Sequence, residues 1–335
     1  MDSSTQFTQP PEWVRHERTL VAWPARRALW GPQLAAAKAT YAEVIRAIAR
    51  FEPVLVVANV GDGAEAVAAT SDAGTHPVEV IEEPIDDSWL RDNGPIVVFD
   101  ASGRRAAIDF RFNAWGERFR PFDADAAVAA RLCDRLGLPR HVAPLVLEGG
   151  AVTVDGTGTL VTTEQCLRNP NRNPDLDQDE IEAALRAWLG VERIVWLERG
   201  LVEDRDTDGH VDNVAAFVAP GVVLAQGVPD AANPNAEILA DNRARLVAAG
   251  LEVLPIDVLP YDTVGDTRVV VPPLNCYLVN GGVIVPVADG DPAAADVTAQ
   301  RFAEVMPERD VVTVPSSVLA YGGGGVHCIT QQVPA

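Results

Sequence analysis

Lysine is almost missing from this chain of 335 residues, in which Lys38 is the only lysine among 27 basic side chains. No Gly-Lys-Ser or Gly-Lys-Thr sequence therefore exists, and the Gly-x-Ser-x-Gly pattern is absent as well. The first absence excludes a P-loop for nucleotide phosphates, and the second excludes the nucleophilic serine turn of the α/β-hydrolases.

Cysteine is also scarce. The four cysteines, Cys133, Cys166, Cys276 and Cys328, lie far apart and form no Cys-x-x-Cys pair. This spacing argues against a disulfide framework or a structural zinc site and is typical of reduced thiols in a cytoplasmic protein. Because the first residues are polar and no apolar run reaches membrane-spanning length, we expect neither a signal peptide nor a membrane helix.

Positive charge is in short supply, since 48 acidic residues give the chain a formal net charge of -21. Nucleic-acid binding requires clustered basic side chains, and the sequence contains no such cluster. We therefore expect no nucleic-acid partner. Surface carboxylates keep a protein soluble, and they also attract a small cationic substrate.

What the sequence does contain is a repeated order of elements. Alanine-rich stretches with helical periodicity cover residues 33–50, 124–136, 177–189, 235–249 and 293–306. Pairs of strand-like runs joined by tight turns precede four of them, at 96–110, 151–162, 215–224 and 276–285, and residues 19–23 with 326–333 would supply a fifth pair. This recurring hairpin, helix and strand (ββαβ) predicts a closed α/β repeat architecture in one domain, residues 1–335, rather than a doubly wound sheet.

A short polar motif stands immediately before each predicted hairpin. If the repeats surround a pseudosymmetry axis, these equivalent positions meet at one end of it. They would bring Asp92, Glu148, His210, Asp212 and Cys328 into a single pocket. Cys328 follows the run of four glycines from Gly322 to Gly325, where the backbone can bend tightly or approach a ligand closely.

These residue types suit chemistry on a guanidinium group. A thiol needs a base or a nearby cation to become a nucleophile, and His210, oriented by Glu148, can move the proton. The carboxylates of Asp92 and Asp212 would raise the pKa of the Cys328 thiol unless a cation sat between them in the working complex. A guanidinium is such a cation, because it is planar, permanently charged and held by carboxylates in pairs.

The motifs resemble the signature segments of the agmatine deiminases, in the guanidino-group-modifying or pentein superfamily. The resemblance is carried by Trp89-Leu90-Arg91-Asp92, Leu147-Glu148-Gly149-Gly150, Asp208-Gly209-His210-Val211-Asp212-Asn213 and Gly325-Val326-His327-Cys328. It implies a five-bladed, pseudosymmetric α/β propeller that hydrolyses agmatine to N-carbamoylputrescine and ammonia without metal or other cofactor. It further implies that Cys328 is the covalent nucleophile, His210 the acid and base with Glu148 as its partner, and Asp92 and Asp212 the guanidinium ligands.

Other assignments leave alternatives open. Asp206 is our candidate for the distal ammonium of the substrate, and Trp89 and Trp115 either contact substrate or simply pack. Residues 204–209 match the start of a calcium loop but lack its terminal glutamate. Gly325 departs from the asparagine expected in the family, which affects tail specificity more than deimination. The competing functions are deimination of peptidylarginine or of free arginine, and a non-enzymatic scaffold. A homodimer is compatible with the sequence. The other histidines, His327 among them, have no acidic neighbour in the sequence and are expected to be structural or exposed.

Overall fold

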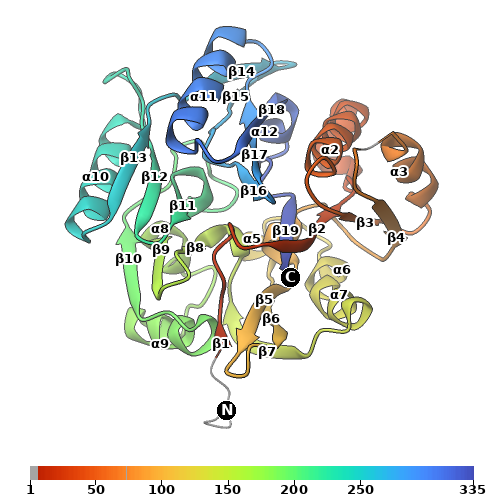
Figure 1. Ribbon diagram of the computed structural model, residues 1–335, viewed down its shortest axis with the longest axis horizontal. Coiled ribbons are helices and arrows are strands. Elements are labelled where there is room, and N and C mark those ends of the chain that lie inside the picture. Colours follow the sequence, from red (N-terminus) through yellow and green to blue (C-terminus); the bar gives the residue numbers. More distant parts are fainter. Residues whose placement is uncertain (1–6, 73) are drawn as a thin grey trace.

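The computed structural model describes residues 7–72 and 74–335 and shows an α/β protein made of several small sheets. Figure 1 shows the long helices at the periphery and the sheets on their inner side. No helix in these two ranges is long and apolar enough to cross a bilayer.

Four consecutive units share one topology, in which an antiparallel hairpin is followed by a helix and then by a strand parallel to the second hairpin strand. The units are β5 (Ile96–Asp100), β6 (Arg105–Arg111), α7 (Val128–Leu136) and β7 (Arg140–Val146); β8 (Val152–Val154), β9 (Thr159–Thr163), α9 (Gln178–Leu189) and β10 (Arg193–Leu197); β11 (Ala215–Ala219), β12 (Val222–Gln226), α10 (Ala236–Ala248) and β13 (Glu252–Ile256); β16 (Tyr277–Val279), β17 (Gly282–Val287), α11 (Pro292–Val305) and β18 (Asp310–Pro315). The four predicted hairpins are thus confirmed.

The fifth unit is assembled from both ends of the chain. Strand β19 (Thr330–Pro334) runs antiparallel to β2 (His16–Ala22), with Thr330 opposite Val21. Helix α2 (Leu34–Ile48) then leads to β3 (Val54–Ala58), which is parallel to β2. The predicted pairing of the two ends is therefore confirmed, and the sheet continues through α3 (Gly63–Thr70) to β4 (Val78–Glu82).

Each long helix covers its sheet with an apolar face. In α2 the side chains of Tyr41, Val44, Ile45 and Ile48 are fully buried, at the spacing of one helical face. Helix α9 begins at a capping box in which Asp177 and Glu180 satisfy each other's backbone N–H groups. Burial and capping together explain why the predicted helices form where the sequence places them.

One predicted helix is divided. Residues 124–136 form α6 (Asp123–Ala126) and α7, separated at Ala127. The Asp125 carboxylate turns back to accept hydrogen bonds from the backbone N–H groups of Asp86 and Asp87, at 2.8 and 3.1 Å. The Asp86 carboxylate in turn caps the N–H of Ala124 at 2.9 Å, so this first turn is tied to a neighbouring loop instead of to α7.

Several short elements fall outside the repeating pattern. They are the strand β1 (Phe7–Thr8), the hairpin β14 (Tyr261–Val264) and β15 (Thr267–Val270), and the single turns α1 (Arg27–Trp30), η1 (Gly31–Gln33), α4 (Leu90–Asn93), α5 (Ala114–Glu117), η2 (Gly149–Ala151), α8 (Glu164–Leu167), η3 (Val211–Asn213) and α12 (Ser317–Tyr321). Of these, α4, η2 and η3 each stand directly before a hairpin, and η2 packs against both α4 and η3.

Candidate active site

The motif residues occupy equivalent places in their units. Asp92 lies in α4, Glu148 precedes η2, His210 and Asp212 begin η3, and Cys328 lies in the turn before β19. All five side chains are at least 95% buried. The predicted convergence of these residues can therefore be examined atom by atom.

Gly150 marks the centre of the cluster. A Cβ atom placed on it would lie 2.6 Å from His210 Nδ1 and 2.9 Å from a carboxylate oxygen of both Asp92 and Asp212. Real Cβ atoms are not found at such distances, so only glycine fits here. Because Gly150 has no side chain, one imidazole and two carboxylates can surround the same small space.

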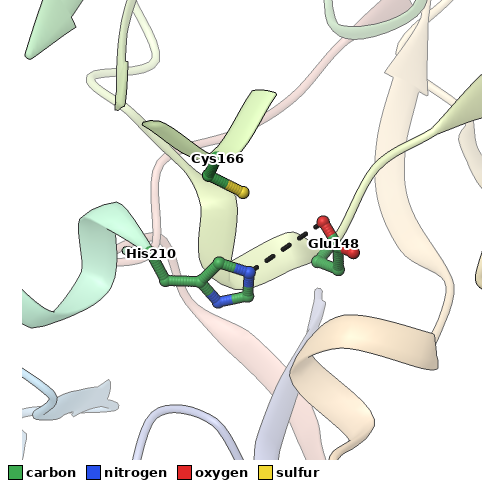
Figure 2. Close-up of side chains that lie close together, drawn as sticks. All are labelled: Glu148, Cys166 and His210. Carbon is green, nitrogen blue, oxygen red and sulfur yellow. Dashed lines mark ion pairs between the residues drawn. The ribbon is translucent and has the colours of Figure 1, made fainter. Parts of the chain in front are cut away.

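His210 lies between two carboxylates and is completely buried. Its Nδ1 is 3.8 Å from Asp92 Oδ1, and its Nε2 is 3.9 Å from Glu148 Oε2, the contact dashed in Figure 2. Burial works to lower the pKa of His210, but Asp92, Cys166 and Glu148 outweigh it, and the pKa is raised well above its ordinary value. The neighbouring carboxylates therefore favour the protonated form of His210.

Arg172 holds Glu148 and was not anticipated from the sequence. Its Nε donates to Glu148 Oε1 at 2.6 Å, and its Nη1 donates to Asp208 Oδ2 at 2.7 Å, with Arg172 itself buried. Burial raises the pKa of Glu148, but the opposing effect of Arg172 and His210 is larger. The net pKa of Glu148 is therefore lowered, which favours the charged carboxylate. Arg172 lies outside the motifs named above, and no spacing rule links it to Glu148.

A left-handed turn aims Trp115 at Asp92. Residues Ala114, Trp115, Gly116 and Glu117 all have φ between 53° and 81°, in the region that L-residues avoid at a cost of roughly 1–2 kcal/mol each. Asn113 stabilises the turn by accepting a hydrogen bond from the N–H of Gly116 at 2.9 Å. The indole Nε1 of Trp115 then donates to Asp92 Oδ2 at 2.9 Å.

Asp92 differs from Asp212 in its electrostatic surroundings. Burial, with additional repulsion from Asp212 and Glu148, raises the pKa of Asp92 to about 6 despite the nearby His210. For Asp212, burial is outweighed by the hydrogen bond and charge of His327 and by His210, which lower its pKa. Both carboxylates are ionised at pH 7, Asp92 with less margin.

The Cys328 thiol lies beside Asp212 and an asparagine. Its Sγ is 3.6 Å from Asp212 Oδ2 and 3.2 Å from Asn275 Nδ2. Burial, together with the charges of Asp212 and Asp92, raises the pKa of the thiol well above its ordinary value. Asn275 belongs to the motif before the fourth hairpin, for which the sequence offered a position but no role.

His327 has two acidic partners in space, although it has none nearby in the sequence. Its Nδ1 lies 2.9 Å from Asp212 Oδ2, and its Nε2 lies 2.9 Å from Glu12 Oε2. Glu12 comes from the segment between β1 and β2, which crosses the centre of the molecule in Figure 1. The start of the chain therefore supports a carboxylate of the site.

Four buried polar atoms around this centre have no hydrogen-bond partner among the described residues. They are Glu148 Oε2, Asp212 Oδ1, and both ring nitrogens of His210. Buried polar groups are almost always paired, because leaving one unpaired costs about 1–3 kcal/mol. Of these atoms, the two carboxylate oxygens can accept hydrogen bonds, so the cluster indicates a place for a polar ligand that supplies N–H groups to them.

A narrow pocket leads to Cys328 and Asp92. Trp89, Trp115 and Asp206 all line it, as do Gly322 and Gly323 from the glycine run. Asp206 is exposed at the mouth, whereas both tryptophans are buried, and Trp89 also stacks on Trp30 at 5.9 Å. A Cβ on Gly324 would come within 2.5 Å of the Trp89 ring, so the lack of a side chain in the glycine run lets the backbone pack directly against this tryptophan.

The calcium-like loop is engaged in hydrogen bonding. Asp204 Oδ2 accepts from the backbone N–H of His210 at 2.9 Å and from Asn213 Nδ2 at 3.0 Å, while its Oδ1 accepts from Thr207 Oγ1 at 2.6 Å. These bonds orient the loop that carries His210. Asp204 acts as a cap, since both of its carboxylate oxygens are taken.

The site combines a thiol, an imidazole and paired carboxylates in an α/β fold of five like units. This combination is typical of enzymes that modify guanidino groups. The family of Porphyromonas-type peptidyl-arginine deiminases matches residues 8–334. The chain therefore belongs to this family.

Similar proteins extend over the whole chain. An agmatine deiminase of Stutzerimonas stutzeri is 41% identical, with 98% of this chain and 96% of the relative covered, and one of Pseudomonas aeruginosa is 40% identical with the same coverage. The solved agmatine deiminase of Enterococcus faecalis has a TM-score of 0.91 and 31% identity, covering 100% of this chain and 98% of that one.

Proposed function

We propose that this protein hydrolyses agmatine, taking one water and releasing N-carbamoylputrescine and ammonia. The observation that carries the proposal is the pair of buried carboxylates, Asp92 and Asp212, beside a thiol whose pKa they raise. Without a ligand the two carboxylates disfavour the thiolate, whereas a cationic ligand bound between them favours it. The names of the full-length relatives, agmatine deiminases at about 40% identity, support the same substrate.

The reaction proceeds through a covalent intermediate on Cys328. Asp92 and Asp212 hold the guanidinium and lower the pKa of the thiol through the charge that they bind. The Cys328 thiol gives up its proton to solvent, and its Sγ then attacks the guanidinium carbon. His210 donates its proton to the departing nitrogen, the C–N bond breaks, and ammonia is released, so that an S-alkylthiouronium remains on Cys328. Neutral His210 then takes a proton from water, which attacks the same carbon and frees the thiol. A solved cysteine-to-serine variant of the C. jejuni agmatine deiminase with substrate bound supports a cysteine nucleophile.

The far end of the substrate would lie toward Asp206. The tetramethylene chain passes Trp89 and Trp115, and the exposed carboxylate of Asp206 at the pocket mouth binds the distal ammonium. Peptidylarginine, which the family description names, and free arginine are the alternative substrates. For these substrates a carboxylate at the mouth is unfavourable for the main-chain carbonyl or α-carboxylate.

The whole fold is, in this proposal, a five-bladed α/β propeller that forms one domain. Five units of like topology, including the one shared by the two ends, support it. A cytoplasmic location, a homodimer and a role in supplying putrescine remain predictions of the same reading.

Ammonia release from agmatine, free arginine and an arginyl peptide, measured side by side, tests the function. We expect turnover of agmatine only, and its complete loss in Cys328→Ala. Cys133→Ala, which removes a buried thiol in α7 remote from the site, should retain activity. Activity in Cys328→Ala would refute the covalent mechanism, and turnover of arginine or peptide in preference to agmatine would refute the substrate.

A further inference from the structure

A second thiol lies against the acid and base of the site. Cys166, on the single turn α8, is fully buried, and its side chain points toward His210 and Glu148 in Figure 2. One ligand atom from each of Glu148, Cys166 and His210 lies within 4.8 Å of the other two. The hydrolysis proposed above uses Glu148 and His210 but makes no use of Cys166.

Two of the polar atoms in this cluster, His210 Nε2 and Glu148 Oε2, face each other at 3.9 Å, beyond hydrogen-bond distance. Glu148 Oε2 and His210 Nε2 are buried side-chain atoms without a hydrogen-bond partner among the described residues. Both residues are completely buried. Arg172 binds only the other oxygen of Glu148, Oε1, at 2.6 Å, and so it fixes the carboxylate while leaving Oε2 free.

The donor set is one sulfur, one imidazole nitrogen and one carboxylate oxygen. This mixture matches the preference of zinc and related borderline ions, whereas calcium and magnesium require several oxygens. Bonds of about 2.0–2.3 Å would place the ligand atoms nearer to one another than 4.8 Å, so a modest inward rotation of the Cys166 and Glu148 side chains completes the site.

We propose that Glu148, Cys166 and His210 form an inhibitory site for Zn²⁺ or a similar thiophilic divalent ion. The metal takes the lone pair of His210 Nε2 and the thiolate of Cys166, and the protons of both groups pass to solvent. Its two positive charges replace those two protons, so the charge balance with Asp92, Glu148 and Arg172 is unchanged. A metal-bound His210 can neither donate a proton to the leaving nitrogen nor accept one from water, and hydrolysis stops.

The decisive measurement is spectroscopic and does not depend on activity. Co²⁺ added to the full-length protein should give a near-ultraviolet thiolate-to-cobalt charge-transfer band. We expect this band to persist in Cys328→Ala, which removes the nucleophile, and to disappear in Cys166→Ala. A band lost with Cys328 and retained without Cys166 would overturn the proposal, as would the absence of any band in the unaltered protein. Cys276→Ser, which alters a buried thiol outside the cluster, is the matched control and should keep the band.

Inhibition provides a second arm, which rests on the proposed function. Zn²⁺ should block ammonia release from agmatine, and Cys166→Ser should raise the half-inhibitory concentration by about tenfold or more, relative to the metal-free activity of that variant. Equal inhibition of both proteins would contradict the site. Ca²⁺ and Mg²⁺ serve as negative controls. If agmatine is not a substrate, the cobalt band still decides whether the metal site exists.

Discussion

At the scale of single residues, the proposed nucleophile Cys328 lies in surroundings that favour the neutral thiol in the free site. Burial, Asp212 and Asp92 all raise the pKa of Cys328. A bound guanidinium neutralises both carboxylates, so the thiolate becomes accessible only in the presence of the group that it attacks. The carboxylates that we propose as guanidinium ligands should therefore also protect the empty site against alkylation and oxidation, since thiolates are the reactive form.

Glu12 should influence catalysis although it does not contact the pocket of Cys328. Its charge stabilises His327, which supports Asp212, and these neighbours with Arg91 lower the pKa of Glu12 to about 2 against the effect of burial. We expect Glu12→Gln to reduce kcat/KM for agmatine by about tenfold, or roughly 1.4 kcal/mol, since one charged hydrogen bond is lost. Steady-state kinetics of ammonia release measures this change in kcat/KM.

Glu17→Gln is the matched control for Glu12. Glu17 on β2 forms surface ion pairs with its neighbour Arg18 and with Arg105 on β6. Its replacement should leave kcat/KM within a factor of two, because exposed ion pairs contribute little. Equal losses in the two variants would mean that the effect is general destabilisation and not support of Asp212.

Gly150→Ala should nearly abolish activity in a folded protein. The new methyl group would meet His210 Nδ1 at 2.6 Å and displace it, and misplacing a reacting group by about 1 Å costs on the order of 100-fold in rate. Overpacking should cost about 1–3 kcal/mol of stability. Kinetics and thermal unfolding of the same preparation separate the two effects.

Gly290→Ala provides a comparable clash elsewhere. Its Cβ would meet Asp262 Oδ1 at 2.7 Å, near the surface and remote from His210. We expect this variant to lose stability without losing turnover. If Gly150→Ala behaved in the same way, the close packing around His210 would have no catalytic significance.

The five residues named from motifs were predictable because each stands at the same place in its unit. Arg172, Asn275, His327 and Glu12 were given no role in the site, for a different physical reason. Their functions depend on partners distant in sequence, such as the contact between Glu12 and His327, or Asn275 and Cys328. Sequence periodicity locates positions on elements, but it does not reveal pairing between side chains of different units.

At the scale of elements, short turns hold the site and long helices support it. The single turns α4, η2 and η3 carry Asp92, Gly150 and Asp212, and the packing of η2 against both α4 and η3 sets the spacing of the charged groups. The left-handed turn of Ala114–Glu117 shows that some backbone strain is retained there, and it positions the Trp115 donor.

The junction at α6 should make stability depend on pH. Burial, opposed by two backbone N–H groups and reinforced by Asp87 and Asp86, raises the pKa of Asp125 to about 7. The unfolded chain ionises this group near pH 4, so its contribution to stability falls as the pH rises from about 4 through 7. Asp125→Asn should therefore stabilise the protein by about 1–4 kcal/mol at pH 8 and much less at pH 5.

Denaturant unfolding at the two pH values checks this expectation. Asp123→Asn alters an exposed carboxylate of the same helix and should show no such difference. If Asp125→Asn were destabilising at both pH values, the carboxylate would be serving as a charged cap and not as a buried acid.

Long helices and hairpins were predictable because their periodicity extends over many residues. The division between α6 and α7 was not, because Asp86 and Asp125 tie the first turn to a loop through side chains. The single turns and the β14–β15 hairpin were not predicted because each of these elements is short. A turn of four residues has too few positions for a repeating pattern to be recognised.

At the scale of the whole molecule, one cooperative unit is expected. Strand β19 completes the sheet of β2, β3 and β4, and its preceding turn carries Cys328. We expect calorimetry to show a single unfolding transition, and removal of residues 330–335 to eliminate it together with activity. Two separate transitions, of which the deletion lowers only one, would show that the units fold independently.

The pairing of β19 with β2 also has a consequence for biosynthesis. Strand β2 leaves the ribosome early, and its outer edge stays unpaired until the last strand follows. An open strand edge invites association with other chains, so this protein should be most prone to aggregation, and most in need of chaperones, while it is still being made. A chain that stops short of Cys328 lacks both the nucleophile and the strand that covers this edge. Such truncated products are therefore inactive, and quality control can recognise them by the uncovered edge.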